Sequence, residues 1–445
     1  MSSANDKKLL ADIEDAIANC MKCGNCMEVC PIYKELQNET AVARGKLALI
    51  EAVIDGRSEI SAGFDKRMAM CVSCKACAAK CPCGVKADEL ILRGRQAAVK
   101  ARGLHPIKKN VFKLLANRTL FDFALRMAGL FGPLQMKKLP GKLAVIARFP
   151  MPGLDKRRVL APFAATPLRS QLPETIKVSA PKMKVAFFTG CTINYVYTDI
   201  GQAVVDVLKA NDVEVTLPPM QHCCGTPVFM SGDADLARVF ARHNIETFER
   251  AGADYIVAAC GSCAEAFKIE YPEMFADDPV MQEKAKGLAK KTYEISEFLV
   301  DVVKFRRDNL GEVKAGVTMH DPCHMARGIK VTSQPREILK AIPGLRLVEM
   351  KNPDRCCGAG GSFSLANYEI SRKINDRKIA DIASTKADIV ATSCGSCRMH
   401  IIDGLVQNNL NQNCLHTVQL LAQAYKAGSA EIDAAKPKKD EFHFH

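Results

Sequence analysis

The chain contains no tryptophan, and only 6% of its 445 residues are aromatic. It has no apolar run that reaches the roughly 18 residues of a membrane-spanning helix, so we expect no membrane span. The first twenty residues are charged and lack the apolar core of a secretory signal. No glycine pattern G-x-G-x-x-G follows a predicted strand, and no P-loop is present, so the sequence predicts no flavin or nicotinamide site on this chain.

Acidic residues are scarce in one segment. The net charge is +13, but residues 91–169 carry 17 Lys and Arg against only Asp122 and Asp155, which gives +15 for this segment alone. A basic protein is first considered for nucleic-acid binding. No recognised nucleic-acid motif occurs in the segment, so we expect no nucleic-acid partner.

Cysteine, in contrast, is abundant, with 20 residues in the chain. Their number is too small for a disulfide scaffold at this length, and their spacing is too regular to be incidental. We therefore expect free thiols that bind metal in a reducing cytoplasm. Two runs near the N-terminus share the pattern C-x2-C-x2-C-x3-C-P, and they are Cys20, Cys23, Cys26, Cys30 and Cys71, Cys74, Cys77, Cys81.

This pattern is the one by which a bacterial-type ferredoxin fold holds two [4Fe–4S] clusters. Structural zinc sites do not call for this triple spacing. In two-cluster ferredoxins the fourth cysteine of each run binds the other cluster. The sequence therefore predicts one cluster on Cys20, Cys23, Cys26 and Cys81, and a second on Cys71, Cys74, Cys77 and Cys30.

The second half of the chain is an internal repeat, offset by about 132 residues, in which each copy carries a cysteine, a Cys-Cys-Gly and a Cys-Gly-Ser-Cys. We call these two sets the first cassette and the second cassette. The first cassette is Cys191, Cys223, Cys224, Cys260 and Cys263, and the second cassette is Cys323, Cys356, Cys357, Cys394 and Cys397.

The cassette cysteines follow predicted strands, at the edge where α/β sheets bind ligands. Adjacent cysteines cannot easily share one tetrahedral zinc, but they can bridge different irons of one cluster. Glycines would let the backbone approach the metal, and these are Gly225, Gly358, Gly360 and Gly361. Soft sulfur ligands favour iron–sulfur or zinc over hard cations, and the residue chemistry leaves both open.

The spacing C-x31–39-C-C-G-x35–37-C-x-x-C resembles the cysteine-rich domain of heterodisulfide reductase subunits. The same domain occurs in the iron–sulfur subunits of glycolate oxidase, anaerobic glycerol-3-phosphate dehydrogenase and lactate-oxidising systems. Two ferredoxin runs followed by two such domains match that architecture over residues 15–425. The resemblance implies a noncubane [4Fe–4S] cluster on the five cysteines of each cassette, although some relatives hold zinc or nothing in one of them.

On this resemblance we expect the iron–sulfur electron-transfer subunit of a multisubunit oxidoreductase. A separate FAD-containing subunit would oxidise a 2-hydroxy acid such as lactate or glycolate, and a quinone or another carrier would accept the electrons. The alternatives are the catalytic subunit of a heterodisulfide-type disulfide reductase, the iron–sulfur subunit of anaerobic glycerol-3-phosphate dehydrogenase, and a zinc-holding assembly module. The sequence assigns no catalytic residue.

The expected fold is multidomain, α+β and α/β. A helical ferredoxin-like domain (1–105) precedes basic amphipathic helices and a proline-rich linker (106–182). Strand–helix alternation then predicts two α/β cysteine-rich domains with parallel sheets (183–312 and 313–427), followed by a disordered tail (428–445). Helices are expected over 5–19, 41–55, 86–103 and 111–131, and strands over 184–190, 254–260, 316–321 and 387–394.

The predicted helix over 111–131 is apolar around most of its circumference. Its narrow non-apolar stripe consists of Thr119, Asp122, Arg126 and Gly129. Such a helix either packs inside the protein or docks on another surface. The flanking Arg118, Lys137 and Lys138 suit an anionic membrane surface, so a peripheral contact with the cytoplasmic face of a membrane is one of the two expectations.

A few candidate residues lie outside these patterns. We expect Cys83 and Cys414 to be buried small hydrophobic residues. His222 and His324 adjoin cassette cysteines and are either residues that tune a cluster potential by hydrogen bonding to its ligands or ordinary loop residues. Asp321 is expected to cap a helix. The terminal FHFH sequence is expected to be a loose tail rather than a metal site.

Overall fold

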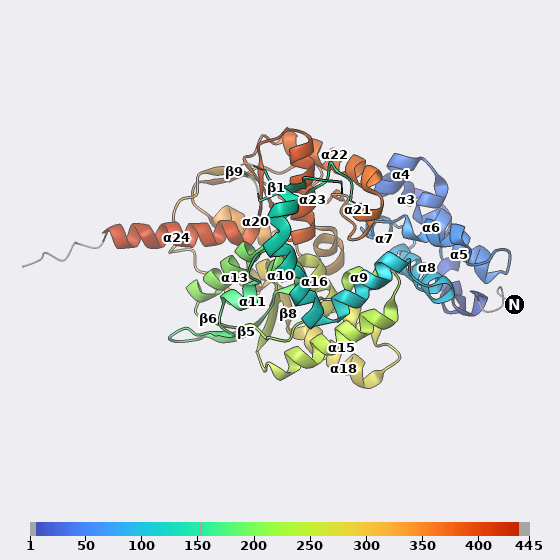
Figure 1. Cartoon of the computed structure of the whole chain (residues 1–445), viewed down its shortest axis with the longest axis horizontal. Coiled ribbons are helices and arrows are strands. Elements are labelled where there is room, and N and C mark those ends of the chain that lie inside the picture. The colour runs from blue at the N-terminus through green and yellow to red at the C-terminus, as the bar shows by residue number, and fades with distance from the viewer. Residues whose placement is uncertain (1–5, 140, 142, 151–153, 436–445) are drawn as a thin grey trace, which may run out of the picture.

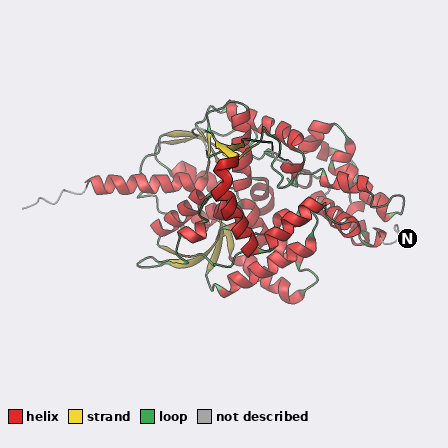
Figure 2. Ribbon diagram, in the orientation of Figure 1, coloured by secondary structure: helices red, strands yellow, loops and turns green. Residues whose placement is uncertain are grey.

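The computed structural model describes residues 6–139, 141, 143–150 and 154–435, with side chains to residue 430. The helical N-terminal domain lies at one end of the molecule (Figure 1). Two α/β units form the body, a long helix, α10, crosses their front face, and the last helix, α24, projects from the opposite end. The strands of the described residues lie in the two α/β units and in the segment that follows α10 (Figure 2).

The N-terminal domain is built from short helices around both cysteine runs. They are η1 (Ala11–Ile13), α2 (Glu14–Ala18), α3 (Asn25–Val29), α4 (Pro31–Leu36), η2 (Glu39–Ala41), α5 (Ala43–Ile54), α6 (Ala62–Ala69), α7 (Ala76–Ala79) and α8 (Ala87–Arg102). Helices α5 and α8 confirm two predicted helices. Their apolar faces form the core of the domain with Leu10, Ile50 and Met68, all fully buried.

The helix predicted over 111–131 is two helices, α9 (Pro106–Ala116) and α10 (Arg118–Gln135). They are separated at Asn117, whose side chain accepts a hydrogen bond from the Leu120 amide and so caps α10. The single-helix prediction was wrong because an apolar pattern continues across a break that a capping residue creates. A small antiparallel sheet follows, with strands β1 (Met136–Lys138), β2 (Val145–Ala147) and β3 (Val159–Leu160).

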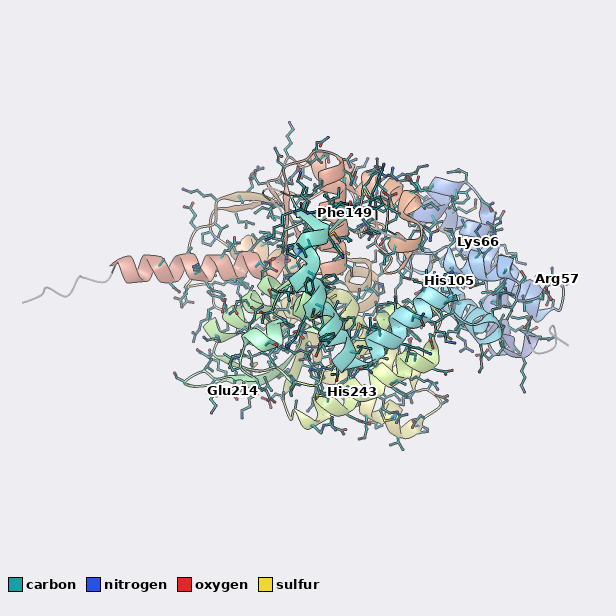
Figure 3. All side chains as sticks on the ribbon, viewed as in Figure 1. Arg57, Lys66, His105, Phe149, Glu214 and His243 are labelled. Carbon is teal, nitrogen blue, oxygen red and sulfur yellow. The ribbon has the colours of Figure 1, made fainter. Side chains whose placement is uncertain are left out.

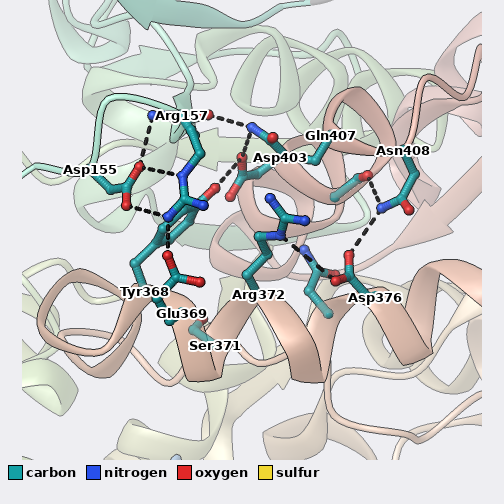
Figure 4. A network of polar contacts seen from close by, with 12 residues as sticks. Asp155, Arg157, Tyr368, Glu369, Ser371, Arg372, Asp376, Asp403, Gln407 and Asn408 are labelled. Atoms are coloured by element: carbon teal, nitrogen blue, oxygen red, sulfur yellow. Dashed lines mark hydrogen bonds and ion pairs between the residues drawn. The ribbon is translucent and has the colours of Figure 1, made fainter.

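The proline-rich segment is more than an extended linker. It contains β3, α11 (Leu168–Gln171) and β4 (Thr175–Ile176). Arg157 pairs with Asp155 and with Glu369 of the second α/β unit, and Figure 4 shows how this network continues through Gln407 to Asp403. The neighbouring Arg158 donates to Ser364, so side-chain contacts order a segment that lacks helical periodicity.

The first α/β unit contains a sheet in the order β4-β6-β5-β7-β8, parallel except for β4. Its strands are β5 (Met183–Phe188), β6 (Val213–Thr216), β7 (Tyr255–Ala258) and β8 (Thr292–Glu294). Its helical segments are α12 (Gly190–Tyr195), α13 (Thr198–Ala210), α14 (Thr226–Phe229), α15 (Ala234–Arg250), α16 (Gly261–Glu265), η3 (Ala266–Glu270), α17 (Tyr271–Met274), α18 (Pro279–Lys291), α19 (Ile295–Glu297) and η4 (Phe298–Val303).

The second unit contains a parallel sheet in the order β10-β9-β11-β12. Its strands are β9 (Ala315–His320), β10 (Leu345–Leu347), β11 (Ile389–Thr392) and β12 (Asn413–His416). Its helical segments are η5 (His324–Ile329), α20 (Ser333–Ala341), α21 (Phe363–Ala366), α22 (Tyr368–Ser384), α23 (Gly395–Gln407) and α24 (Thr417–Ala435). Strands β5, β7, β9 and β11 confirm the four predicted strands, and both units confirm strand–helix alternation.

The two units pack through equivalent elements. Helix α13 of the first unit contacts α24 of the second, and α20 of the second contacts α19 and η4 of the first. Two hydrophobic cores therefore run through both units instead of one core lying in each. Gly311 donates its amide to the Ala424 carbonyl, and the first part of the expected tail, residues 428–435, is helical because α24 continues to Ala435. The FHFH sequence lies outside the described residues.

Candidate metal centres

Both N-terminal cysteine runs form the same kind of loop. Lys22 and Gly24 have positive φ angles of 56° and 87°, and the equivalent Ser73 and Lys75 have 52° and 60°. Left-handed residues at alternate positions turn successive amides toward one side, which makes a concave loop that suits an anionic group. The repeated backbone geometry shows that the two runs are structural equivalents as well as sequence equivalents.

The cysteines predicted for the first cluster lie around one open pocket. The cysteines that line it are Cys20, Cys23, Cys26, Cys77, Cys81 and Cys83. Cys81 comes from the second run, as the ferredoxin arrangement predicts. Cys83 was expected to be buried but is exposed, because the turn that follows Pro82 carries it to the surface.

The cysteines predicted for the second cluster also lie close together, since Cys30 feels the charges of Cys71 and Cys74. Burial raises the pKa of Cys30 to about 12 and that of Cys77 well above its usual range. A buried thiol with a raised pKa is stable as a thiolate only when a cation or cluster is bound. Cys74 is fully buried and its thiol is also within hydrogen-bond reach of Cys356, in the second cassette.

The first cassette brings all five of its cysteines together. Cys191 and Cys224 each contact Cys223, the Sγ atoms of Cys263 and Cys224 lie 3.6 Å apart, and Cys260 contacts Cys263. Cys191 is half-buried and the other four are buried. The Thr226 hydroxyl lies 3.5 Å from the Cys224 Sγ atom at the edge of this group.

The second cassette divides its cysteines into two groups. Cys323 and Cys356 contact each other and Cys74. Cys357 and Cys397 instead form a compact set with His320, in which the ligand atoms lie within 4.8 Å of one another. Cys394 contacts Cys397. Sequence reasoning missed His320, although aligning the two copies would have placed it opposite Phe188 of the first unit.

The thiol groups form a row through the molecule, in which the adjacent residues Cys356 and Cys357 link the two groups of the second cassette. The Sγ atoms of Cys260 and Cys394 lie 3.9 Å apart, so the two cassettes meet at equivalent cysteines. The second cassette in turn meets the N-terminal domain at Cys74 and Cys356. An apolar cluster that contains Ile32, Val72, Phe363 and Ile374 closes this junction.

A buried ion network, which no sequence pattern predicts, lies beside the junction. Glu265 is fully buried, and it pairs with Lys75 Nζ at 2.6 Å and with the His324 ring. Burial by itself would lower the pKa of His324, but the Glu265 carboxylate outweighs burial and raises it to about 9. Burial, with the neighbouring charge of Glu265, raises the pKa of Glu270 to about 8. His324 is therefore tied to Lys75 and Glu265 rather than being an ordinary loop residue.

The remaining candidates have structural roles. His222 packs edge-on against His243 with 4.2 Å between ring centroids, and burial lowers the pKa of His222 to about 4. Asp321 does not cap a helix, because its carboxylate pairs with Arg336 at 2.8 Å. Cys414 is buried, as expected.

The glycine after each Cys-Cys pair is required by the backbone. Gly225 has a φ of 84° and Gly358 a φ of 90°, values that residues with a Cβ rarely adopt. A Cβ on Gly358 would lie 2.6 Å from the Ser371 carbonyl oxygen, whereas a Cβ on Gly225 would meet only the Phe240 Cβ, at 3.3 Å. The two Cys-Cys-Gly turns therefore share a left-handed glycine conformation directly after their thiols.

The donor sets fit iron–sulfur groups. The N-terminal sets are four thiols each on concave loops, and the cassettes offer buried thiols on glycine turns beside strand ends. Soft thiolates select zinc, copper(I) or iron–sulfur clusters over hard cations. These sets together define four candidate centres, and the group that each one holds stays a prediction.

Family models match the same regions of the chain. The model of the 4Fe-4S dicluster domain matches residues 16–85. The model of the cysteine-rich domain matches twice, at residues 185–268 and 317–402. The expected duplication and the expected ferredoxin-like domain are thereby confirmed.

Curated relatives agree with this assignment. The probable glycolate oxidase iron-sulfur subunit of Bacillus subtilis is 29% identical over 427 residues, which is 92% of this chain and 94% of the relative. An uncharacterized iron-sulfur protein of Methanococcus maripaludis is 28% identical over 89% of this chain and 70% of its own length. Lactate utilization protein A of Halalkalibacterium halodurans is 38% identical over 54% of this chain and 96% of its own length. The chain therefore belongs to the family of iron–sulfur proteins that includes lactate utilization protein A.

Proposed function

We propose that the chain is the iron–sulfur electron-transfer subunit of a flavin-dependent 2-hydroxy-acid dehydrogenase. The observation that supports this best is the row of thiols that joins the dicluster domain to both cassettes through Cys74–Cys356 and Cys260–Cys394. Relatives carry names that refer to glycolate oxidase and to lactate utilization. Lactate or glycolate is accordingly the substrate class that a partner subunit would oxidise.

The proposal gives this chain's residues a limited set of tasks. Iron–sulfur clusters, when bound, exchange single electrons, which a two-electron substrate and a remote acceptor require. Cysteines hold the clusters, the left-handed loops wrap them, and buried apolar side chains such as Ile32 and Phe363 keep water from the junction. No residue of the described chain needs to bind the hydroxy acid.

The ligand assignment that we propose keeps the two N-terminal sets as cubane sites and each cassette as a noncubane site. Four clusters of four irons predict about 16 irons per chain. Anaerobic purification followed by iron, sulfide and zinc analysis tests this number. A result of about eight irons with stoichiometric zinc would show that the cassettes are zinc sites instead.

A partner subunit carries the flavin in this proposal, and a quinone or another carrier receives the electrons. The isolated chain should therefore not oxidise lactate or glycolate with an artificial dye, and activity should appear when the co-purifying flavoprotein is added. Strong dehydrogenase activity from the chain alone would contradict the proposal. Reduction of a disulfide by the isolated chain with a one-electron donor would favour the disulfide-reductase alternative.

Helix α10 supports a peripheral contact, because its polar stripe faces the protein. Asp122 pairs with the Tyr195 hydroxyl, Arg126 donates to Ser170 at 3.1 Å, and Gly129 packs against the Ala164 backbone. The apolar side is left outside, with Phe123, Leu130 and Leu134 between 61% and 69% exposed. Figures 1 and 3 show α10 on the front face of the molecule, with the exposed Phe149 near its far end.

We propose that this apolar side of α10 rests on an anionic bilayer. The surrounding segment has a charge of +15 from 17 basic and two acidic residues, which complements anionic headgroups. Within the described residues, no helix is long and apolar enough to cross a membrane. The contact would therefore be peripheral, with an apolar part that salt does not weaken and a charge part that salt does weaken.

Vesicle co-sedimentation across a salt series tests the contact. Phe123→Ser with Leu130→Ser should abolish the salt-resistant binding, and Lys137→Glu with Lys138→Glu should reduce binding at low salt. Val239→Ser, which removes a 60% exposed apolar side chain on α15, is the matched control and should have no effect. Wild-type complex that ignores anionic vesicles at low salt would rule the contact out and leave a partner subunit as the occupant.

A further inference from the structure

His320 is a buried imidazole without hydrogen bonds. It is the last residue of β9, it has no exposed surface, and neither ring nitrogen has a hydrogen-bond partner among the described residues. An unpaired polar group in an apolar interior destabilises the fold, because it loses its hydrogen bonds to water without replacing them. The other two buried histidines of this unit differ, since His400 contacts Ser371 Oγ at 2.9 Å and His416 contacts the Ala259 carbonyl at 3.1 Å.

The fold itself does not need an imidazole at this position. The equivalent residue of the first unit is Phe188, which ends β5 three residues before Cys191, as His320 ends β9 three residues before Cys323. Phe188 is 1% exposed and packs against Phe248 and Phe267. A purely apolar ring therefore fills this place in one copy, and the unpaired nitrogens of His320 need another explanation.

The ring faces thiols. One ring nitrogen of His320 and the Sγ atoms of Cys357 and Cys397 all lie within 4.8 Å of one another. Zinc binds imidazole nitrogen at about 2.0 Å and thiolate sulfur at about 2.3 Å, so a shared metal fits this set with small side-chain shifts. The Pro353 carbonyl lies near the ring without forming a hydrogen bond to either nitrogen, and a metal-bound histidine commonly donates its second N–H to such a carbonyl.

We propose that His320 is a ligand of the metal group in the second cassette, together with Cys357 and Cys397. The second cassette is then a mixed nitrogen–sulfur site, whereas the first cassette is bound by sulfur alone. This inference rests on the proposed function only in assuming that the second cassette holds a metal. In [2Fe–2S] proteins, histidine in place of cysteine raises the reduction potential, so the second cassette should be the more readily reduced of the two.

The test uses the full chain, purified anaerobically, with iron and zinc measured per chain. His320→Phe, which copies the first unit, should lose the metal of the second cassette, about four irons if it is a [4Fe–4S] cluster or one zinc if it is not. His320→Cys should retain the metal, and if the group is a cluster it should lower the potential in an EPR-monitored titration. His400→Phe is the matched control and should keep the wild-type metal content, because His400 is equally buried but is bonded to Ser371.

A second measurement does not depend on any variant folding. Labelling the wild-type chain with [15N]histidine should change the nitrogen hyperfine couplings that pulsed EPR detects in the reduced protein. Cobalt(II) replaces the metal for this measurement if the cassette holds zinc. Wild-type metal content in His320→Phe, or labelled protein without a histidine coupling, would overturn the proposal, and so would a wild-type second cassette that holds no metal.

Eight irons with one zinc in the wild type would contradict the four-cluster proposal but not this one. The loss of that zinc in His320→Phe would still identify the ligand. The failure of the proposed function and the failure of the His320 assignment are therefore distinguishable.

Discussion

The two cassettes share a sequence pattern and a backbone, yet the groups around their thiols differ. In the first cassette the five thiols lie together and Phe188 packs behind them. In the second cassette the thiols divide between Cys74 on one side and His320 on the other. The two copies therefore share their cysteines and turns. The residues around the thiols differ, and so does the position of each cassette in the row of thiols.

The largest expected effect follows from the position of the second cassette beside the N-terminal domain. Cys74→Ser should lose about four irons from its own cluster and should also change the EPR signals of the second cassette. Cys23→Ser, at the equivalent position of the first run, should lose a similar amount of iron without altering the cassette signals. Identical spectra of the second cassette in both variants would show that the Cys74–Cys356 contact has no influence on it.

The second prediction concerns Glu265, which stands in the first unit where the second unit has Met399. Lys75→Met would leave the buried Glu265 with His324 as its remaining partner, and breaking a buried pair costs about 3–5 kcal/mol. Anaerobic chemical denaturation measures this loss. Lys80→Met, which removes an exposed pair with Glu28, should change the free energy of unfolding by less than about 1 kcal/mol. Equal effects of the two variants would mean that the buried pair does not stabilise the junction.

The glycines that follow the Cys-Cys pairs give a smaller difference between the copies. Gly225→Ala and Gly358→Ala each force a Cβ into the left-handed region, at about 1–2 kcal/mol. Gly358→Ala should cost at least about 1 kcal/mol more, because its Cβ would clash with a backbone carbonyl rather than a side chain. Thermal unfolding of the two variants compares them, and a more stable Gly358→Ala would contradict the tighter packing of the second turn.

The last difference between the two units is a pH dependence of opposite sign. Glu294 and His416 occupy equivalent caps and accept hydrogen bonds from the amides of Ser296 and Val418. Burial raises the pKa of Glu294 to about 8 and lowers that of His416 to about 4. The first cap therefore loses stability as pH rises from the unfolded pKa of about 4.3 to 8, and the second loses stability as pH falls from about 6.5 to 4.

Hydrogen exchange at α19 and α24 measures the two caps separately. Each slope should be at most about 1.4 kcal/mol per pH unit. Glu294→Gln should flatten only the dependence at α19, and His416→Gln only that at α24. A dependence of the same sign at both helices would contradict the assigned protonation states.

Much of the fold followed from local patterns in the sequence. Helices α5 and α8 and strands β5, β7, β9 and β11 appear where periodicity predicts them, because a buried face repeats along an element at a fixed spacing. Two predictions failed where a local pattern was incomplete. Asn117 ends one helix and caps the next within an apolar run, and α24 continues past residue 427 because its first turns pack on α13.

The candidate centres divide in the same way. The sequence determined the cysteine sets, because metal ligands on one loop must recur at short fixed spacings, and it determined the duplication, because the copies kept those spacings. Only the tertiary structure decided which surfaces meet: Cys74 against Cys356, Lys75 against Glu265, His320 against Cys357 and Cys397, and the polar side of α10 against the protein. These contacts join residues far apart in the chain, so no spacing along the sequence encodes them.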